Sequence, residues 1–435
     1  MSHFSNLIQK YRDVAKTQRE KGNYFEQLCI KYFQNEPCYA ELFKNVQTYT
    51  EWAHSQDLPG NDAGIDLIAT TFDGEFHAIQ CKLYEEDAKI PKSEIDSFLS
   101  AASKRYFSRR YIISTSRNWS ENALNTLQNQ DPPVTKINLE TLENSSIDWS
   151  KFEEKKEIVL KKKKELYPYQ ETALRAVNRG LYQDQLERGK LLMACGTGKT
   201  FTSLKIAEEF VGKGKRVLFL VPSLSLLSQT LREWTQESLI PLHSYAVCSD
   251  SEVGKKQNKN DIDAVTTLEH ELQYPATTDA KKLTENISKH HDENHMTVVF
   301  STYHSINTIS EAQHKYAMTE FDMIICDEAH RTTGATHSNE DDSKFVKIHD
   351  ADFILGKKRL YMTATPRIFS DDVKDDAKEY TLYSMDNEDL FGQVLYTINF
   401  SEAVNLGLLV DYKVIVLAVD SDTIVQKIGN VITEH

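Results

Sequence analysis

Residues 191–200 read LLMACGTGKT, a short apolar run followed by a loop with two glycines and then by Lys199 and Thr200. The apolar run predicts a buried strand, and residues 203–210 have the apolar spacing of an amphipathic helix. A glycine loop between a strand and a helix N-terminus can direct several backbone N–H groups at one phosphate. The stretch therefore predicts an α/β fold organised around a phosphate-binding loop.

This loop supplies the groups that a nucleoside triphosphate requires. Gly196, Thr197 and Gly198 provide backbone donors, Lys199 reaches the β and γ phosphates, and the hydroxyl of Thr200 can bind Mg²⁺. The strict pattern GxxxxGK[ST] begins with glycine, where this chain has methionine at position 193. An ordinary glycine-rich turn is the alternative, so the interpretation depends on a second element.

The second element is residues 321–330, FDMIICDEAH, a strand-like run that ends in two adjacent carboxylates. Asp327 can hold Mg²⁺ at the strand end, and Glu328 can polarise the water that attacks the phosphate. An acidic pair after a strand is, when it occurs alone, usually a solvated turn. Combined with the glycine loop, it predicts a site that binds ATP and Mg²⁺.

Apolar runs of strand length alternate with helical stretches from Leu166 to Thr365. This alternation predicts a parallel sheet with helices on both faces. We expect that lobe to span residues 166–385. We expect residues 386–435 to form a linker and the start of a second lobe, with a strand at 412–419.

The first 150 residues predict a separate α/β domain. Residues 3–35 have helical spacing, and strand patterns occur at 65–82 and 111–114. Residues 151–165, KFEEKKEIVLKKKKE, are dense in charge and are interpreted as a linker that can form a solvated helix. The lysines at 161–164 either form a solvated face or contact DNA phosphates.

A candidate metal site lies on a predicted hairpin around residues 72–75, FDGE. Asp66 and Gln80 offer oxygen ligands for Mg²⁺, and Lys82 can stabilise the attacking water or the phosphate charge. A two-residue turn would place Asp66 on the sheet face opposite Gln80 and Lys82. We therefore predict a three-residue loop or a bulge. The alternative is a structural hairpin in which Asp66 only caps a turn.

Composition excludes several classes of protein. The formal net charge of -14 argues against a protein that coats DNA, so any DNA contact must be a local channel. Apolar runs are too short to span a bilayer, and the N-terminus has no signal-like core, which predicts no membrane association and a cytoplasmic location. The cysteines lack paired spacing, so we expect neither disulfides nor structural zinc. Three polar residues near the hairpin are interpreted as surface residues: Glu75, His77 and Glu85.

The order of motifs over residues 165–420 resembles that of superfamily 2 helicases, which implies a RecA-like lobe. Residues 327–330, DEAH, are similar to the family's signature, and this likeness adds His330 to the ATP site. Residues 167–170, YPYQ, resemble the adenine-recognising segment and imply that Tyr169 and Gln170 contact the nucleotide. Residues 221–223 and 301–305 resemble DNA-backbone motifs, and 363–366, TATP, resembles the element that couples hydrolysis to DNA movement.

Residues 20–130 resemble the Mrr-like branch of the PD-(D/E)xK nucleases, in which glutamine can replace the acidic residue of the last motif. The resemblance implies a restriction-endonuclease-like fold. It also implies that Glu26 occupies the upstream acidic position and binds the metal ion with Asp66 and Gln80, while Lys82 completes the catalytic set.

The two parts together resemble the N-terminal part of type ISP restriction-modification enzymes. That resemblance implies an ATP-dependent translocase joined to an endonuclease that cuts foreign double-stranded DNA. The second lobe's arginine, the methyltransferase and the target-recognition region of that family lie outside this sequence. We therefore expect a fragment or truncated form that binds ATP·Mg²⁺ but hydrolyses it slowly. The open alternatives are a regulatory module, or a DNA- or RNA-binding helicase-like remodeller without nuclease activity.

Overall fold

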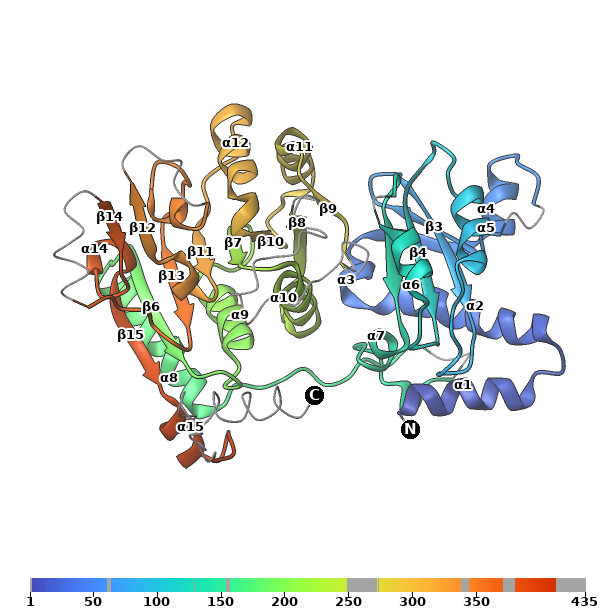
Figure 1. Ribbon diagram of the computed structural model, residues 1–435, viewed down its shortest axis with the longest axis horizontal. Coiled ribbons are helices and arrows are strands. Elements are labelled where there is room, and N and C mark those ends of the chain that lie inside the picture. Colours follow the sequence, from blue (N-terminus) through green and yellow to red (C-terminus); the bar gives the residue numbers. More distant parts are fainter. Residues whose placement is uncertain are drawn as a thin grey trace, which may run out of the picture.

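The computed structural model describes residues 2–60, 64–128, 130–153, 157–248, 272, 274–337, 344–370 and 380–411. These residues form two α/β bodies that lie side by side and are joined by an extended segment (Figure 1). No helix in the described ranges has the length and apolar character needed to cross a bilayer.

The N-terminal body is built on a five-stranded mixed sheet in the order β1-β2-β3-β4-β5. β1 and β2 pair antiparallel, as do β2 and β3, whereas β3, β4 and β5 are parallel. The strands are β1 (Phe43–Thr48), β2 (Leu67–Thr71), β3 (Phe76–Lys82), β4 (Phe107–Ser114) and β5 (Val134–Ile137).

Helices cover both faces of this sheet. Apolar residues of α1 (His3–Val14), α2 (Gln18–Asn35), α3 (Pro37–Ala40) and α7 (Leu139–Glu143) pack on one face. Residues of α4 (Tyr49–Ser55), α5 (Ser93–Ala101) and α6 (Glu121–Leu127) pack on the other. The helical region predicted at 3–35 is two helices, because Thr17 and Glu20 form a capping box that starts α2.

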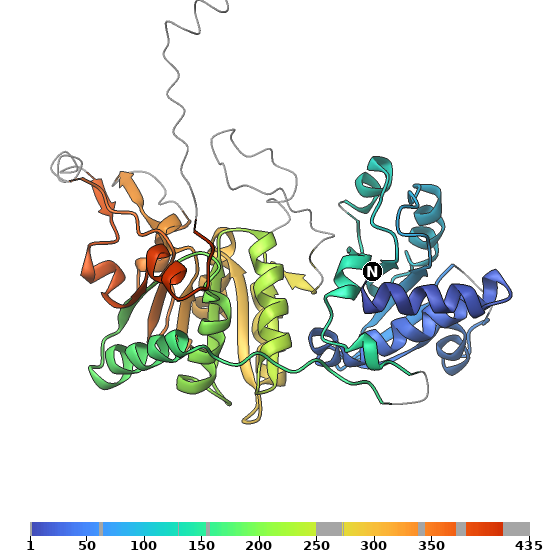
Figure 2. The ribbon, with the colours of Figure 1, turned by 90° about the horizontal axis from the view of Figure 1, so that it is seen from below.

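The segment between the bodies is extended in its described residues, 151–153 and 157–165, apart from a short 3₁₀ turn at Trp149–Lys151. The expected helix is therefore not observed there, and Figure 2 shows the segment crossing between the bodies. Its lysines bind protein acceptors on either side. Lys161 donates to the carbonyl of Ser145 at 2.7 Å, and Lys164 pairs with Glu233 at 3.0 Å. These contacts hold the backbone extended.

The C-terminal body contains an eight-stranded sheet in the order β15-β6-β13-β11-β7-β10-β8-β9, in which every pairing is parallel. This confirms the predicted parallel sheet. Its strands are β6 (Arg188–Met193), β7 (Arg216–Val221), β8 (Leu242–Val247), β9 (Ala276–Thr277), β10 (Met296–Thr302), β11 (Met323–Cys326), β13 (Arg359–Thr363) and β15 (Gln393–Ile398). A small antiparallel pair joins β12 (Gly334–His337) to β14 (Tyr380–Tyr383).

Both faces of this sheet are buried. Val217, Phe219 and Val221 of β7 belong to the core with α8 (Pro168–Val177), α9 (Lys199–Phe210) and α10 (Leu224–Glu237). Leu218 and Leu220 belong to the core with α11 (Ala280–His290) and α12 (Ile306–Tyr316). Shorter helical segments are Asn178–Gln183, Tyr303–Ser305, Ala329–Thr332, Val346–His349, α14 (Glu388–Phe391) and α15 (Phe400–Asn405).

The C-terminal boundary differs from the one expected at residue 385. β15 pairs with β6 and forms the edge of the same sheet, so residues 393–398 belong to this lobe rather than to a linker. Leu395 closes over Gly180 and Gly189, where an added Cβ would lie 2.4 and 2.5 Å from its side chain. The strand expected at 412–419 lies outside the described residues.

Polar contacts join the two bodies at several places, two of which involve Glu36 and the β2–β3 hairpin. Glu36, which is buried, accepts from Gln236 of α10 at 2.7 Å and from the backbone of Ser146 at 2.8 Å. The tip of the β2–β3 hairpin contacts α11, where Lys282 pairs with Glu75 at 3.3 Å. These polar contacts, together with the linker, set how the bodies face one another.

Candidate active sites

The glycine loop leaves β6 at its carboxyl end and enters α9. Gly196 and Gly198 have φ of +82° and +77°, a region that strongly favours glycine. An added Cβ on Gly198 would also lie 2.8 Å from Nε2 of Gln170. Thr197 is buried, and its hydroxyl donates to the carbonyl of Ala194 at 2.7 Å. The backbone N–H of Thr197 donates to the same carbonyl at 3.3 Å, so both groups of Thr197 stabilise the turn of the loop.

Lys199 and Thr200 begin α9, which follows Gly198 directly. The Lys199 ammonium donates to the carbonyl of Met193 at 3.4 Å and lies 3.8 Å from the carboxylate of Glu328. Thr200, the predicted Mg²⁺ ligand, is the second residue of the helix. The glycine loop, a lysine and a hydroxyl thus meet at a helix N-terminus, where an anion is favoured.

The second predicted element meets the loop at the same sheet edge. β11 is separated from β6 only by β13, so Asp327, Thr363 and the glycine loop all follow the carboxyl ends of neighbouring parallel strands. Ligand sites in such sheets lie at this edge. Glu328 has φ +47°, a conformation that costs about 1–3 kcal/mol in a residue with a side chain. The strained turn directs Glu328 back towards Lys199.

His330 links the acidic pair to the next strand. Its Nδ1 lies 2.9 Å from the hydroxyl of Thr363 and 3.3 Å from the carboxylate of Glu328. Thr363 in turn accepts from the backbone N–H of Thr365 at 3.2 Å. This chain of contacts joins the carboxylate of Glu328 to the TATP segment. Thr363 was assigned only by its motif, and the contact shows how it reaches the site.

The two adjacent carboxylates have opposite electrostatic environments. Burial, then the neighbouring charge of Glu328, raises the pKa of Asp327 to about 6. Burial opposes ionisation of Glu328 as well, but the hydrogen bond with His330 and the charge of Lys199 hold its pKa below the ordinary value. A cation beside Asp327 would favour its charged form. Asp327 therefore suits a metal ligand, and Glu328 a carboxylate that stays ionised.

Tyr169 and Gln170 contact the loop from α8. The Tyr169 hydroxyl donates to the carbonyl of Thr197 at 2.9 Å. Gln170 is buried, and its Nε2 donates to the carbonyls of Thr197 and Gly198 at 3.4 and 3.5 Å. Its Oε1 accepts from the backbone N–H of Tyr167 at 3.0 Å. Both residues thus contact the loop's backbone, and their contact with adenine stays a prediction.

In the N-terminal body, the hairpin register confirms the predicted loop. Leu67 pairs with Ile79 and Thr70 with Phe76, and the backbone N–H of Thr71 donates to Glu75 at 2.9 Å. Three residues, 72–74, therefore form the loop, and Gly74 has φ +84°. The paired register ends at Leu67 and Ile79, and the backbone N–H of Asp66 donates to the carbonyl of Ile79 at 3.0 Å, so Asp66 lies just beyond the ladder at the same end as Gln80.

The three hairpin residues lie at the end of the hairpin away from its loop. Asp66 accepts from the backbone N–H of Cys81 at 2.6 Å, and Gln80 donates through Nε2 to the carbonyl of Gly64 at 3.2 Å. The Lys82 ammonium pairs with Glu94 of α5 at 3.0 Å. The carbonyl oxygen Oε1 of Gln80 is buried and has no hydrogen-bond partner among the described residues. An oriented, unpaired oxygen beside a carboxylate is a suitable metal ligand.

Glu26 approaches this group from α2. Its charge and that of Asp66 both raise the pKa of the Cys29 and Cys81 thiols, after the larger effect of burial. Glu26 and Asp66 therefore act on the same two neighbouring thiols. Lys82 and Glu94, by contrast, lie on the α5 side of the sheet. Asp66 immediately precedes β2, at the end of the hairpin away from its loop.

One prediction for this hairpin is wrong. His77 is buried rather than on the surface, with its ring 5.3 Å from that of Phe43 and 5.8 Å from that of Tyr111. Burial lowers its pKa. The side chains of β3 alternate between the two faces of the sheet, as expected for a strand. Because β3 is a central strand with helices on both faces, its polar side chains are covered as well. Glu75 is half-buried and Glu85 is exposed.

Comparisons with known proteins agree with this division. Residues 34–159 match a family model described as restriction endonuclease, and residues 163–368 match one described as type III restriction enzyme, res subunit. The chain joins a nuclease domain to a helicase domain. The nuclease and helicase domains are of kinds that use a divalent metal ion and ATP.

A solved structure shares nearly the whole arrangement. The ATP-dependent type ISP restriction-modification enzyme LlaBIII bound to DNA is 39% identical, with a TM-score of 0.74, over 95% of this chain and 26% of that one. The probable helicase A859L of African swine fever virus (isolate Tick/Malawi/Lil 20-1/1983) is 31% identical over 254 residues, which are 56% of this chain and 23% of the viral protein. The chain thus spans about a quarter of the length of these relatives.

Sequence reasoning missed the surface between the nuclease and helicase domains. Glu36, Gln236, Lys282 and His290 contact residues far away in the sequence. No local motif marks such positions. The signal that existed was the density of histidines between residues 290 and 295, which has no role in either motif set.

Proposed function

We propose that this chain is the nuclease and motor part of a restriction enzyme of the type ISP kind, which uses ATP to move along double-stranded DNA and Mg²⁺ to cut it. The observation that carries the proposal is the hairpin register. Asp66 and Gln80 both lie at the end of this hairpin away from its loop, in a domain that is linked to the proposed ATP site.

The nuclease residues fit a hard divalent ion. Asp66 supplies a carboxylate, and Gln80 supplies a buried oxygen without another partner among the described residues. Glu26 adds negative charge from α2. Bound Mg²⁺ supplies Lewis-acid stabilisation of the charge that forms on the phosphate. Lys82 is held by Glu94 at 3.0 Å and can add a positive charge or orient the attacking water.

The helicase residues fit ATP with Mg²⁺. The loop around Gly196 and Gly198 offers backbone donors, and Lys199 offers a positive charge to the β and γ phosphates. Thr200 and Asp327 are the proposed metal ligands. Glu328 holds the attacking water and takes up its proton, since its pKa is low enough to keep it ionised. His330 positions Glu328 and relays its state to Thr363.

The nuclease centre lies at the end of the hairpin opposite the loop that contacts the motor. The hairpin loop contacts α11 of the helicase domain, and Gln80 lies five residues along β3 from Glu75, or about 17 Å at strand rise. We assign target recognition and any methyltransferase to regions outside this chain.

Cleavage of plasmid DNA tests the proposal. The parent chain is expected to nick or cut the DNA only with Mg²⁺, and Lys82→Ala is expected to abolish cutting while leaving ATP binding intact. Lys199→Ala is expected to abolish ATP binding while leaving Mg²⁺-dependent cutting intact. Metal-dependent cutting that is equal in the parent and in Lys82→Ala would refute the assignment. Equal binding of RNA and DNA without cleavage would favour a remodeller.

A further inference from the structure

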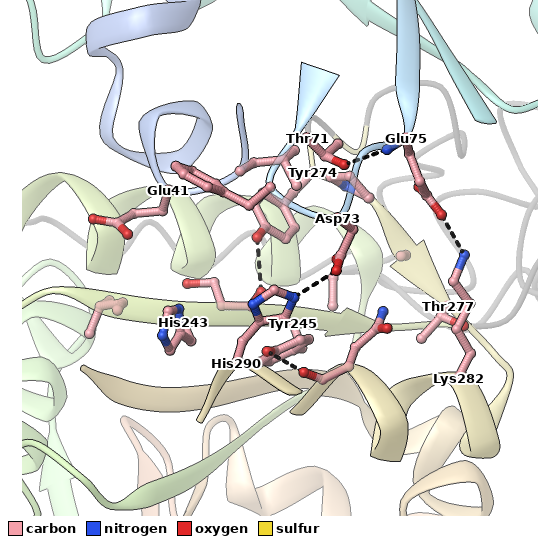
Figure 3. Close-up of a pocket in the computed structure, with 18 of the residues that line it drawn as sticks. Glu41, Thr71, Asp73, Glu75, His243, Tyr245, Tyr274, Thr277, Lys282 and His290 are labelled. Carbon is pink, nitrogen blue, oxygen red and sulfur yellow. Dashed lines mark hydrogen bonds and ion pairs between the residues drawn. The ribbon is translucent and has the colours of Figure 1, made fainter. Parts of the chain in front are cut away.

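A cavity of about 400 Å³ lies between the nuclease and helicase domains. The nuclease side contributes Glu41, Thr71 and His77, and the helicase side contributes His243, Tyr245 and His295. Glu41 and His243 lie at one end of the cavity, and the Glu75–Lys282 ion pair lies at the other (Figure 3). Neither the nuclease nor the ATP mechanism uses this cavity.

Three metal-ligating side chains meet at the first end. Glu41 follows α3, His243 lies on β8, and His295 precedes β10. Their ligand atoms all lie within 4.8 Å of one another. The imidazoles of His243 and His295 stack with ring centroids 3.9 Å apart and an angle of 22°. Two imidazoles and one carboxylate thus face one another across the domain boundary.

A further carboxylate orients this group. Asp292 binds Nδ1 of His295 at 2.8 Å, and Nε2 of the same ring lies 3.8 Å from the carboxylate of Glu41. The backbone N–H groups of Asn294 and His295 hold Asp292 at 2.7 and 2.9 Å. A carboxylate on one ring nitrogen that leaves the other nitrogen for a metal is the usual support of a histidine ligand.

We propose that Glu41, His243 and His295 bind a divalent transition-metal ion of the zinc type at the boundary between the domains. Two imidazoles and a carboxylate are a common zinc set, with a fourth position open to water. Mg²⁺ prefers six oxygen ligands, which this group does not offer. Cysteine spacing could not reveal the site, since its ligands are two histidines and a glutamate from three separate segments.

The ion would join the two domains, because Glu41 belongs to the nuclease domain and both histidines belong to the helicase domain. It would act beside existing ion pairs at the hairpin loop, such as that of Asp73 with Lys289 and His290. The site is distinct from the proposed Mg²⁺ site, which lies at the other end of the hairpin. Its role is to hold the nuclease domain at a fixed angle on the motor.

Titration of the chelator-treated full chain with Co²⁺, and competition by Zn²⁺, tests this proposal without any activity assay. One Co²⁺ per chain is expected to give the strong visible absorption of a four-coordinate ion, and Zn²⁺ should displace it. His243→Gln and His295→Gln should remove the absorption. Asp292→Asn should weaken Co²⁺ binding by about 10–100-fold, and Glu41→Gln, which replaces a ligand, should weaken it at least as much.

Two control variants separate this site from the others. Asp66→Ala removes the proposed nuclease ligand, and His314→Ala removes an exposed histidine of α12. Both should keep the parent spectrum. Circular dichroism and thermal unfolding of each variant establish that it is folded, and Glu41→Gln, at an exposed residue, keeps the test valid if a histidine variant unfolds.

The proposal is overturned if Co²⁺ shows only weak six-coordinate absorption. It is also overturned if Asp66→Ala removes the spectrum while the folded Glu41→Gln variant keeps the parent affinity. In that case Asp292 and Glu41 would serve only as ion-pair partners of the two histidines.

Discussion

Gln80→Leu separates a metal ligand from a structural residue, because the two roles predict opposite effects on stability. In the parent, Nε2 of Gln80 donates to Gly64 at 3.2 Å, a bond worth about 0.5–1.5 kcal/mol. Oε1 is buried without a partner among the described residues, which costs about 1–3 kcal/mol. Leucine of similar size removes both terms. The free energy of unfolding should therefore stay about unchanged or rise by about 2 kcal/mol.

The same change should nearly abolish DNA cleavage. A metal ion contributes several kcal/mol of transition-state stabilisation, and the loss of about 3 kcal/mol corresponds to a rate about 100-fold lower. Mg²⁺ should also raise the melting temperature of the parent and not that of the variant, because a ligand that binds only the folded state stabilises it.

The assays are urea unfolding, thermal unfolding with and without Mg²⁺, and single-turnover plasmid cleavage. Gln47→Leu is the matched control, since Gln47 is a half-buried glutamine on β1 of the same sheet with no place in the metal site. Cleavage by Gln80→Leu at the parent rate would refute the reasoning. So would a loss of more than about 2 kcal/mol in stability, which would make Gln80 a structural residue.

Three further predictions concern the helicase domain. Glu328→Gln should keep ATP binding and lower hydrolysis about 100-fold, and an unchanged rate would exclude Glu328 as the base. Gly198→Ala should destabilise the domain by about 1–2 kcal/mol and weaken ATP binding, because Gly198 has φ +77° and an added Cβ would meet Gln170. Thermal unfolding with and without ATP measures both effects. A melting temperature and an ATP-induced shift equal to those of the parent would contradict this prediction. Burial lowers the pKa of His349 to about 4. The neutral, buried His349 therefore contributes its full share to the free energy of unfolding above pH 6.5, and this share is lost as the pH falls towards 4. Roughly 3 kcal/mol of unfolding free energy should disappear in that window, and folded His349→Phe should lack that part of the slope, whereas parallel slopes would argue against it.

The parts of the fold that depend on local pattern could be predicted from the sequence. Strand periodicity decides which side chains share a face, so the parity of positions 66, 80 and 82 was enough to require a three-residue loop. The alternation of strands and helices likewise predicted the parallel sheet and brought the glycine loop, Asp327 and Thr363 to one edge.

Other features depend on contacts between distant segments. His77 was misjudged because the cover of a central strand depends on helices elsewhere in the chain. The linker forms no helix in its described residues because Lys161 and Lys164 bind acceptors on the flanking domains, which a charge pattern does not reveal. β15 was assigned to a linker because its pairing with β6 spans about two hundred residues of sequence.

Anomalous diffraction from crystals grown with Mn²⁺ and a non-hydrolysable ATP analogue tests the central claim most directly. Mn²⁺ is an oxygen-seeking ion and substitutes for Mg²⁺. The account predicts one peak between Asp66 and Gln80 and a second between Thr200 and Asp327 beside the nucleotide. A nucleotide-bound peak without any peak at the hairpin, in crystals saturated with Mn²⁺, would contradict the joining of a metal-dependent nuclease to this motor.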